Sequence, residues 1–157
     1  MRKLLLVFAA LILSSVKSRA DAPGPFGVGL VLGDPTGISA NYYKSAERSI
    51  DAALAWSFGS ETGLEFHADY LWHRRGLFHV ETVPFSMLYG IGGRVLFVNS
   101  KNNDAAKTKI GPRLPLGIET NFNQKAIEVF AEIALVMNLV PATSADLDFG
   151  IGARVYF

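Results

Sequence analysis

The residues with the greatest chemical potential in this 157-residue chain lie in one alternating segment. His67 has Glu65 two residues before it and Asp69 two residues after it, so an extended backbone places all three side chains on one face. An imidazole beside carboxylates can act as a general base or as a metal ligand. With Ser39 or Asp69 it could serve a lipid-modifying enzyme, but we favour membership of a polar network and expect no catalytic residue, metal or cofactor.

Other charged residues fall on the same face as His67 when the remaining strands are aligned by their alternation. Buried charges are stable only when they are paired, so we expect the three arginines to be clasped by carboxylates. An eight-stranded barrel leaves little open space, which favours a salt-bridged plug over an open conduit. The predicted network comprises Asp51, Glu65, His67, Asp69, Arg94, Arg113, Glu128, Glu132, Asp148 and Arg154.

These residues must be positioned by strands, because apolar residues alternate strictly through Thr62–His73, where every second residue from Leu64 to Trp72 is apolar. A repeat of two is the pattern of a half-buried strand. Eight such segments with short polar connections predict an all-β, eight-stranded antiparallel up-and-down transmembrane β-barrel. The other seven segments are Phe26–Gly33, Gly37–Tyr43, Ser49–Ser57, Phe85–Val98, Lys109–Glu119, Ala126–Asn138 and Asp146–Phe157.

The apolar face carries large aromatic and aliphatic residues, whereas the other face carries charges and many glycines. An eight-stranded interior is too narrow for so many large side chains, and glycines suit a packed interior. The polar face also lacks the lysines that a soluble exterior usually carries. The apolar face is therefore expected to point outward, towards lipid. The alternative is a soluble periplasmic barrel that binds a lipid inside.

Two stretches fit this plan poorly. Pro112 and Pro115 remove backbone donors from the sixth segment, so that strand either bulges or has other boundaries. We interpret Arg74–Pro84 as a long connection, of which Leu77–Val80 could instead extend the fourth strand. His73 and His79 flank a basic pair there, and we expect both to lie in a solvated or headgroup-level turn.

The N-terminus has the order of a secretory signal peptide. Arg2 and Lys3 precede the apolar run Leu4–Leu13, and Ser18 and Ala20 supply small residues at the cleavage site. The run is shorter than the roughly 20 residues of a membrane-spanning helix. We therefore expect residues 1–20 to be removed and residues 21–157 to form one exported domain. A net charge of +1 gives no electrostatic case for binding nucleic acid.

Several stretches resemble known bacterial barrels. The C-terminus alternates apolar residues and ends in an aromatic one, which resembles the signal read by the outer-membrane assembly machinery: Phe149, Ile151, Ala153, Val155 and Phe157. The stretches GLVLGDPTGISANYY, IDAALAWSF, FHADYLWH and YGIGGRVLF resemble an uncharacterised family of small OmpA/OmpX-like barrels. The resemblance implies a bacterial outer-membrane location with lipid and the assembly machinery as partners, and no established catalytic residues. We interpret the role as structural, or as binding of an unidentified surface ligand through Asn99–Thr108 and Leu139–Ser144.

Overall fold

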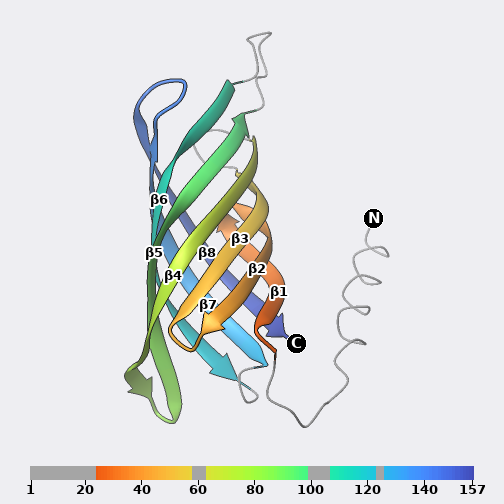
Figure 1. Cartoon of the computed structure of the whole chain (residues 1–157), viewed down its shortest axis with the longest axis vertical. Coiled ribbons are helices and arrows are strands. Elements are labelled where there is room, and N and C mark those ends of the chain that lie inside the picture. Colours follow the sequence, from red (N-terminus) through yellow and green to blue (C-terminus); the bar gives the residue numbers. More distant parts are fainter. Residues whose placement is uncertain (1–23, 58–62, 99–106, 123–125) are drawn as a thin grey trace, which may run out of the picture.

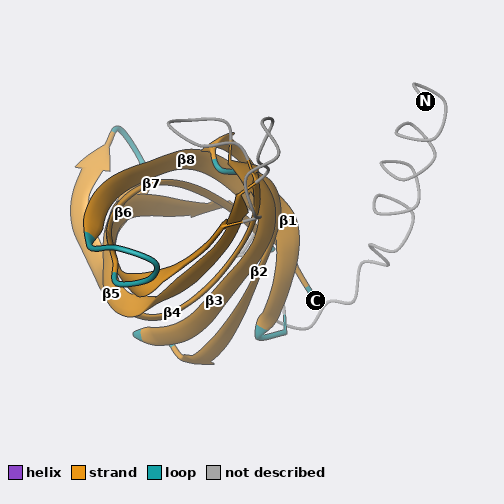
Figure 2. Ribbon diagram, turned by 90° about the horizontal axis from the view of Figure 1, so that it is seen from above, coloured by secondary structure: helices purple, strands orange, loops and turns teal. Residues whose placement is uncertain are grey.

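Alternation with a period of two produces eight antiparallel strands that close into a barrel in order from β1 to β8 (Figure 1, Figure 2). The computed structural model describes residues 24–57, 63–98, 107–122 and 126–157. The strands are β1 (Phe26–Asp34), β2 (Thr36–Ser45), β3 (Arg48–Ser57), β4 (Gly63–Val80), β5 (Val83–Val98), β6 (Lys107–Phe122), β7 (Ile127–Asn138) and β8 (Ser144–Tyr156). The predicted fold class, an all-β barrel of eight strands, is confirmed. The described residues contain no helix long and apolar enough to cross a membrane.

The barrel closes between its first and last strands. β1 pairs with β8 from Gly27↔Tyr156 to Asp34↔Phe149. The backbone N–H of Phe157 donates to the carbonyl of Phe26 at 3.0 Å, and their rings meet edge to face. Closure leaves no unpaired sheet edge. The start of β1 and the C-terminus lie together at one end of the barrel (Figure 1).

The two faces of the wall point as the sequence predicts. Large apolar side chains face outward on every strand, and Leu30, Ile133 and Ile151 have 57%, 52% and 63% of their surface exposed. The charged side chains of the predicted network face inward. Some apolar residues also face inward, and Val31, Leu71, Leu88 and Phe130 form a small buried cluster. The interior is thus a mixture of ion pairs and apolar contacts.

The prediction that Arg74–Pro84 is a connection is wrong, whereas the alternative extension of the fourth strand is present. β4 runs on to Val80 and pairs with β5 up to Val80↔Val83, forming a hairpin that projects beyond the barrel wall (Figure 1). The register shifts between Arg74 and Phe78, and Gly76 there has a positive φ of 63°. This irregularity interrupts the alternation, which is why the sequence pattern favours a connection over a continuous strand.

The two prolines of β6 are accommodated without a bulge. The β5–β6 register is constant, but Pro115 falls in a gap of the ladder between Tyr89↔Leu116 and Gly92↔Arg113. On the other side of β6, the β7 ladder stops at Arg113, one residue after Pro112. Each proline therefore lies where a missing N–H donor interrupts few ladder bonds. The predicted boundaries of this strand were too short, and apart from the extended end of β4 the ends of the other strands agree with the prediction to within two residues.

Some of the predictions for the termini and loops concern residues that the structure does not describe. The predicted signal peptide, residues 1–20, lies outside the described residues, as do residues 99–106 of one predicted surface loop. Of the other predicted loop, Leu139–Ser144, residues 139–143 connect β7 to β8 and Ser144 begins β8, and Leu139 and Val140 are exposed.

Candidate functional site

The interior of the barrel is organised around three arginines. Arg94, on β5, donates from Nη1 to Asp148 at 2.8 Å and from Nη2 to the amide oxygen of Asn138 at 2.9 Å. It also pairs with Asp146 and lies 3.6 Å from Glu65 Oε2. Asp146 and Asn138 were not predicted, because they lie near strand ends where inward and outward positions are difficult to assign. Asp146 bridges to one further cation, Lys109 of β6, at 3.5 Å.

Arg113, on β6, joins three carboxylates from three different strands. Its guanidinium pairs with Asp69 and donates to Glu132 at 2.6 Å and to Asp148 at 3.3 Å. Asp148 therefore links Arg113 to Arg94. Because these contacts cross the interior, they tie β4, β6, β7 and β8 together independently of the backbone ladder.

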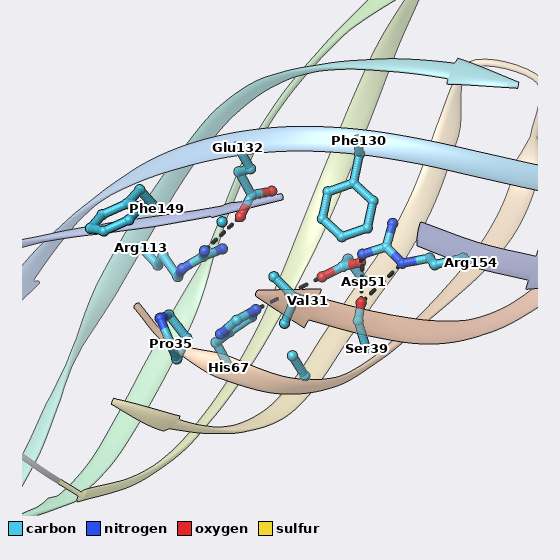
Figure 3. A pocket seen from close by; sticks show the side chains of 12 residues that line it. Val31, Pro35, Ser39, Asp51, His67, Arg113, Phe130, Glu132, Phe149 and Arg154 are labelled. Carbon is cyan, nitrogen blue, oxygen red and sulfur yellow. Dashed lines mark hydrogen bonds and ion pairs between the residues drawn. The ribbon is translucent and has the colours of Figure 1, made fainter. Parts of the chain in front are cut away.

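Arg154, on β8, lies beside Ser39 of β2 and Asp51 of β3 (Figure 3). It pairs with Asp51, donates to Glu128 at 2.9 Å, and donates to Ser39 Oγ from Nε at 2.9 Å and from Nη2 at 2.6 Å. Its guanidinium also stacks over the Phe130 ring, 4.0 Å from the centroid. Each of the three guanidinium nitrogens thus has an acceptor, and an aromatic ring covers one face of the cation.

His67 faces the interior between two carboxylates. Its Nδ1 makes a 3.0 Å hydrogen bond with Glu65, and its Nε2 lies 3.9 Å from Asp51 Oδ1. Ser39 is held by Arg154 and not by His67, so the serine and the histidine of the lipid-modifying hypothesis are not assembled as a catalytic pair. All ten residues of the predicted polar network therefore face one interior.

A second cluster was missed by the sequence analysis and corrects one prediction. His73 does not lie in a solvated turn but is buried, with Nε2 2.8 Å from Ser49 Oγ and Nδ1 3.0 Å from Glu119 Oε1. Arg75 donates to the same oxygen of Glu119 at 2.6 Å. We call Ser49, His73, Arg75 and Glu119 the His73 cluster. The signal was available, since His73 continues the inward series of His67, Asp69 and Leu71.

The His73 cluster has the connectivity of a hydrolytic triad: a serine hydroxyl, an imidazole and a carboxylate in series. A triad acts only where a substrate carbonyl reaches the serine oxygen. Ser49 is fully buried, with 0% of its surface exposed, and Glu119 is shared with Arg75. The arrangement therefore links β3, β4 and β6, with the serine hydroxyl closed off from solvent.

Aromatic hydroxyls connect the His73 cluster to the arginines. Tyr43 and Tyr156 donate to the same oxygen of Glu128 at 2.8 and 3.0 Å, and Asn41 donates to the Tyr156 hydroxyl at 2.8 Å. The Tyr43 ring also lies 5.0 Å from that of His73. These tyrosines were not predicted as interior residues, because an aromatic residue in a membrane barrel is expected at the interface.

Little free volume remains among these side chains. A cavity of about 20 Å³ is bounded by Ser39, Asp51, His67, Arg113 and Arg154 (Figure 3). That volume suits about one water molecule. The interior around His67 is thus closely packed.

Comparisons with known proteins support the fold. No family model matches the chain, and no curated protein matches it. Among solved structures, the crystal structure of the N-terminal β-barrel domain of Pseudomonas aeruginosa OprF is similar, with a TM-score of 0.64 and 10% sequence identity. The match covers 86% of this chain and 99% of that one. It confirms the resemblance to small OmpA-like barrels at the level of fold.

Proposed function

We propose that this chain is a bacterial integral outer-membrane barrel, exported with residues 1–20 as a cleaved signal peptide. The observation that carries the proposal is the orientation of the wall. Apolar side chains such as Leu30, Ile133 and Ile151 are exposed around the barrel, while the ion pairs lie inside. A soluble barrel would leave this apolar surface in water, whereas a membrane accommodates it.

The two alternative functions are less well supported. A soluble lipid carrier needs a large apolar interior cavity, but the cavity beside His67 has only about 20 Å³. A lipid-modifying enzyme needs an accessible nucleophile, but Ser39 and Ser49 are both at most 1% exposed. We therefore propose a non-enzymatic barrel with a structural or surface-binding role, its salt bridges holding the interior shut.

The proposed partners follow from the surface. Outer-membrane lipid contacts the apolar band, and the assembly machinery reads the C-terminal strand, where Phe149, Ile151 and Phe157 are more than half exposed. A surface ligand, if one binds, contacts the connections at residues 99–108 and 139–144.

Heat modifiability combined with membrane fractionation tests this proposal. We expect the mature protein in the outer-membrane fraction and a change of gel mobility between boiled and unboiled samples, because a closed barrel resists detergent until it is heated. A protein that stays soluble without detergent and shows no mobility change would contradict the proposal.

The packed interior predicts that the barrel does not conduct ions. Purified protein added to a planar lipid bilayer should give no stepwise current, because Arg94, Arg113 and Arg154 with their carboxylates fill the interior. A large porin, whose strands enclose an aqueous channel, serves as the positive control. Regular single-channel steps from the wild-type barrel would show that the interior opens.

A charge placed on the outer wall should be costly if that wall faces lipid. Ile133 lies in the middle of β7 and is half exposed, so Ile133→Arg should lower the free energy of unfolding by about 2–4 kcal/mol. Val140→Arg, beyond the end of β7, should cost about 0–1 kcal/mol. Urea titration of barrels folded into lipid vesicles measures both, and equal effects at the two positions would argue against a lipid-facing wall.

A further inference from the structure

The ion pairs inside the barrel do not balance. The carboxylates that form them number eight: Asp51, Glu65, Asp69, Glu119, Glu128, Glu132, Asp146 and Asp148. The arginine and lysine cations that face them number five: Arg75, Arg94, Lys109, Arg113 and Arg154. Three negative charges are therefore in excess within the described interior. An uncompensated charge at low dielectric is costly, so this interior favours the uptake of additional positive charge.

Three of these carboxylates, Glu65, Asp51 and Asp69, lie around His67. The 3.0 Å contact between its Nδ1 and Glu65 Oε1 favours the tautomer in which Nδ1–H donates to the carboxylate. The lone pair on Nε2 then faces Asp51 Oδ1 at 3.9 Å, which is too long for a hydrogen bond. Two electron-rich atoms thus face each other, and a carboxylate behind the histidine is the usual second partner of an imidazole that binds a metal.

Each neighbouring aspartate also retains an oxygen for a ligand. Asp51 pairs with Arg154 through Oδ2, and Asp69 pairs with Arg113 through Oδ2. Asp69 Oδ1 is buried and has no hydrogen-bond partner, and the residue as a whole is only 2% exposed. Asp51 Oδ1 is the atom that faces His67. Each of the two carboxylates therefore keeps one oxygen, Oδ1, that is not paired with an arginine.

We propose that His67, Asp51 and Asp69 bind a divalent transition-metal cation of the zinc class inside the barrel. All three residues are buried, and each offers a ligand atom within 4.8 Å of the other two. One imidazole nitrogen with carboxylate oxygens suits such an ion. The adjoining cavity of about 20 Å³ supplies space beside Asp51 and His67 (Figure 3). The site is structural: it offsets two of the three excess charges and cross-links β3 to β4.

This metal site goes beyond the proposed function. The proposed function does not depend on it, because the barrel remains an outer-membrane protein whether or not it binds metal. It departs from the absence of a metal that we expected from the sequence. The reason is that sequence spacing placed His67 with Glu65 and Asp69 on one strand, whereas the barrel brings in Asp51 from β3 opposite Asp69.

Zinc titration of the tag-free, detergent-solubilised protein after dialysis against EDTA tests the site. We expect one zinc per barrel by calorimetry and elemental analysis, and a rise in Tm with added zinc, because a ligand that binds only the folded state stabilises it. His67→Gln and Asp69→Asn should each weaken binding by about tenfold or more. His79→Ala, on the projecting hairpin, is the matched control and should bind as the wild type does.

Heat modifiability of each variant establishes that its barrel is closed before metal binding is compared. If a folded wild-type protein takes up no zinc at micromolar concentration, the metal site is wrong while the barrel stands. Zinc binding that survives both His67→Gln and Asp69→Asn, or that disappears with His79→Ala, would equally overturn it.

Discussion

Arg154→Ala should lower the free energy of unfolding by about 3–5 kcal/mol, the cost of leaving buried charges without their partner. Arg154 is 3% exposed and pairs with Asp51 and Glu128, which are themselves 2% and 0% exposed. Removing the guanidinium also removes both donors to Ser39 and the cation over the Phe130 ring. Few other single substitutions would leave two carboxylates unpaired in so dry an environment.

Equilibrium unfolding in urea, with the barrel folded in lipid vesicles, measures this loss. Arg74→Ala is the matched control, because Arg74 lies on the exposed face of β4 and an exposed charge contributes at most about 1 kcal/mol. An Arg154→Ala barrel within 1 kcal/mol of the wild type would mean that water reaches Asp51 and Glu128.

A compensating change separates lost packing from unpaired charge. Asp51→Asn in the Arg154→Met background removes one of the two orphaned charges while methionine fills much of the vacated volume. We expect this double variant to be more stable than Arg154→Met alone, which has the same packing at residue 154, because the two residues are in contact and their effects are not additive. If the double variant is no more stable, then Glu128 accounts for the destabilisation.

The strands were predictable because lipid on one side and ion pairs on the other impose a strict repeat of two. The run from Leu64 to Trp72 placed β4, and the same parity places His73 inward. We assigned His73 to a turn because its neighbours Arg74 and Arg75 are charged. The structure shows that Arg75 also turns inward, to Glu119. At His73 the alternation of the strand is therefore a better guide to burial than the charge of the neighbouring residues.

The partners of each buried charge could not be predicted, although the face that holds them could. A contact across the interior depends on how far each strand is displaced along its neighbour, and a sequence does not state that displacement. Arg94 was expected to meet a carboxylate, yet nothing in the spacing identifies Asp146 and Asn138 as its partners. Tyr156 was likewise hidden, since it adjoins an outward terminal aromatic residue, and its hydroxyl contacts Glu128 of the neighbouring strand β7.

Closure of the barrel depends on close approach of β1 and β8, and Gly29→Val should disrupt it. A Cβ at Gly29 would lie 1.8 Å from the backbone oxygen of Ala153 and 2.7 Å from the Cα of Arg154. Overpacking a core usually costs about 1–3 kcal/mol because side chains can adjust. Backbone atoms of a paired strand cannot rotate away, so the penalty should exceed that range and the two strands should separate.

Gly93→Val supplies the matched control, because it makes the same chemical change at another strand glycine. A Cβ there meets only the backbone oxygen of Gly111, at 3.8 Å, which is ordinary contact, and valine favours strands. We expect Gly93→Val to keep the gel-mobility change on heating and Gly29→Val to lose it or to lose it at a much lower temperature. If both variants behaved alike, the β1–β8 seam would be able to widen, and closure would depend on the ion pairs that cross the interior more than on the fit of the strands at this seam.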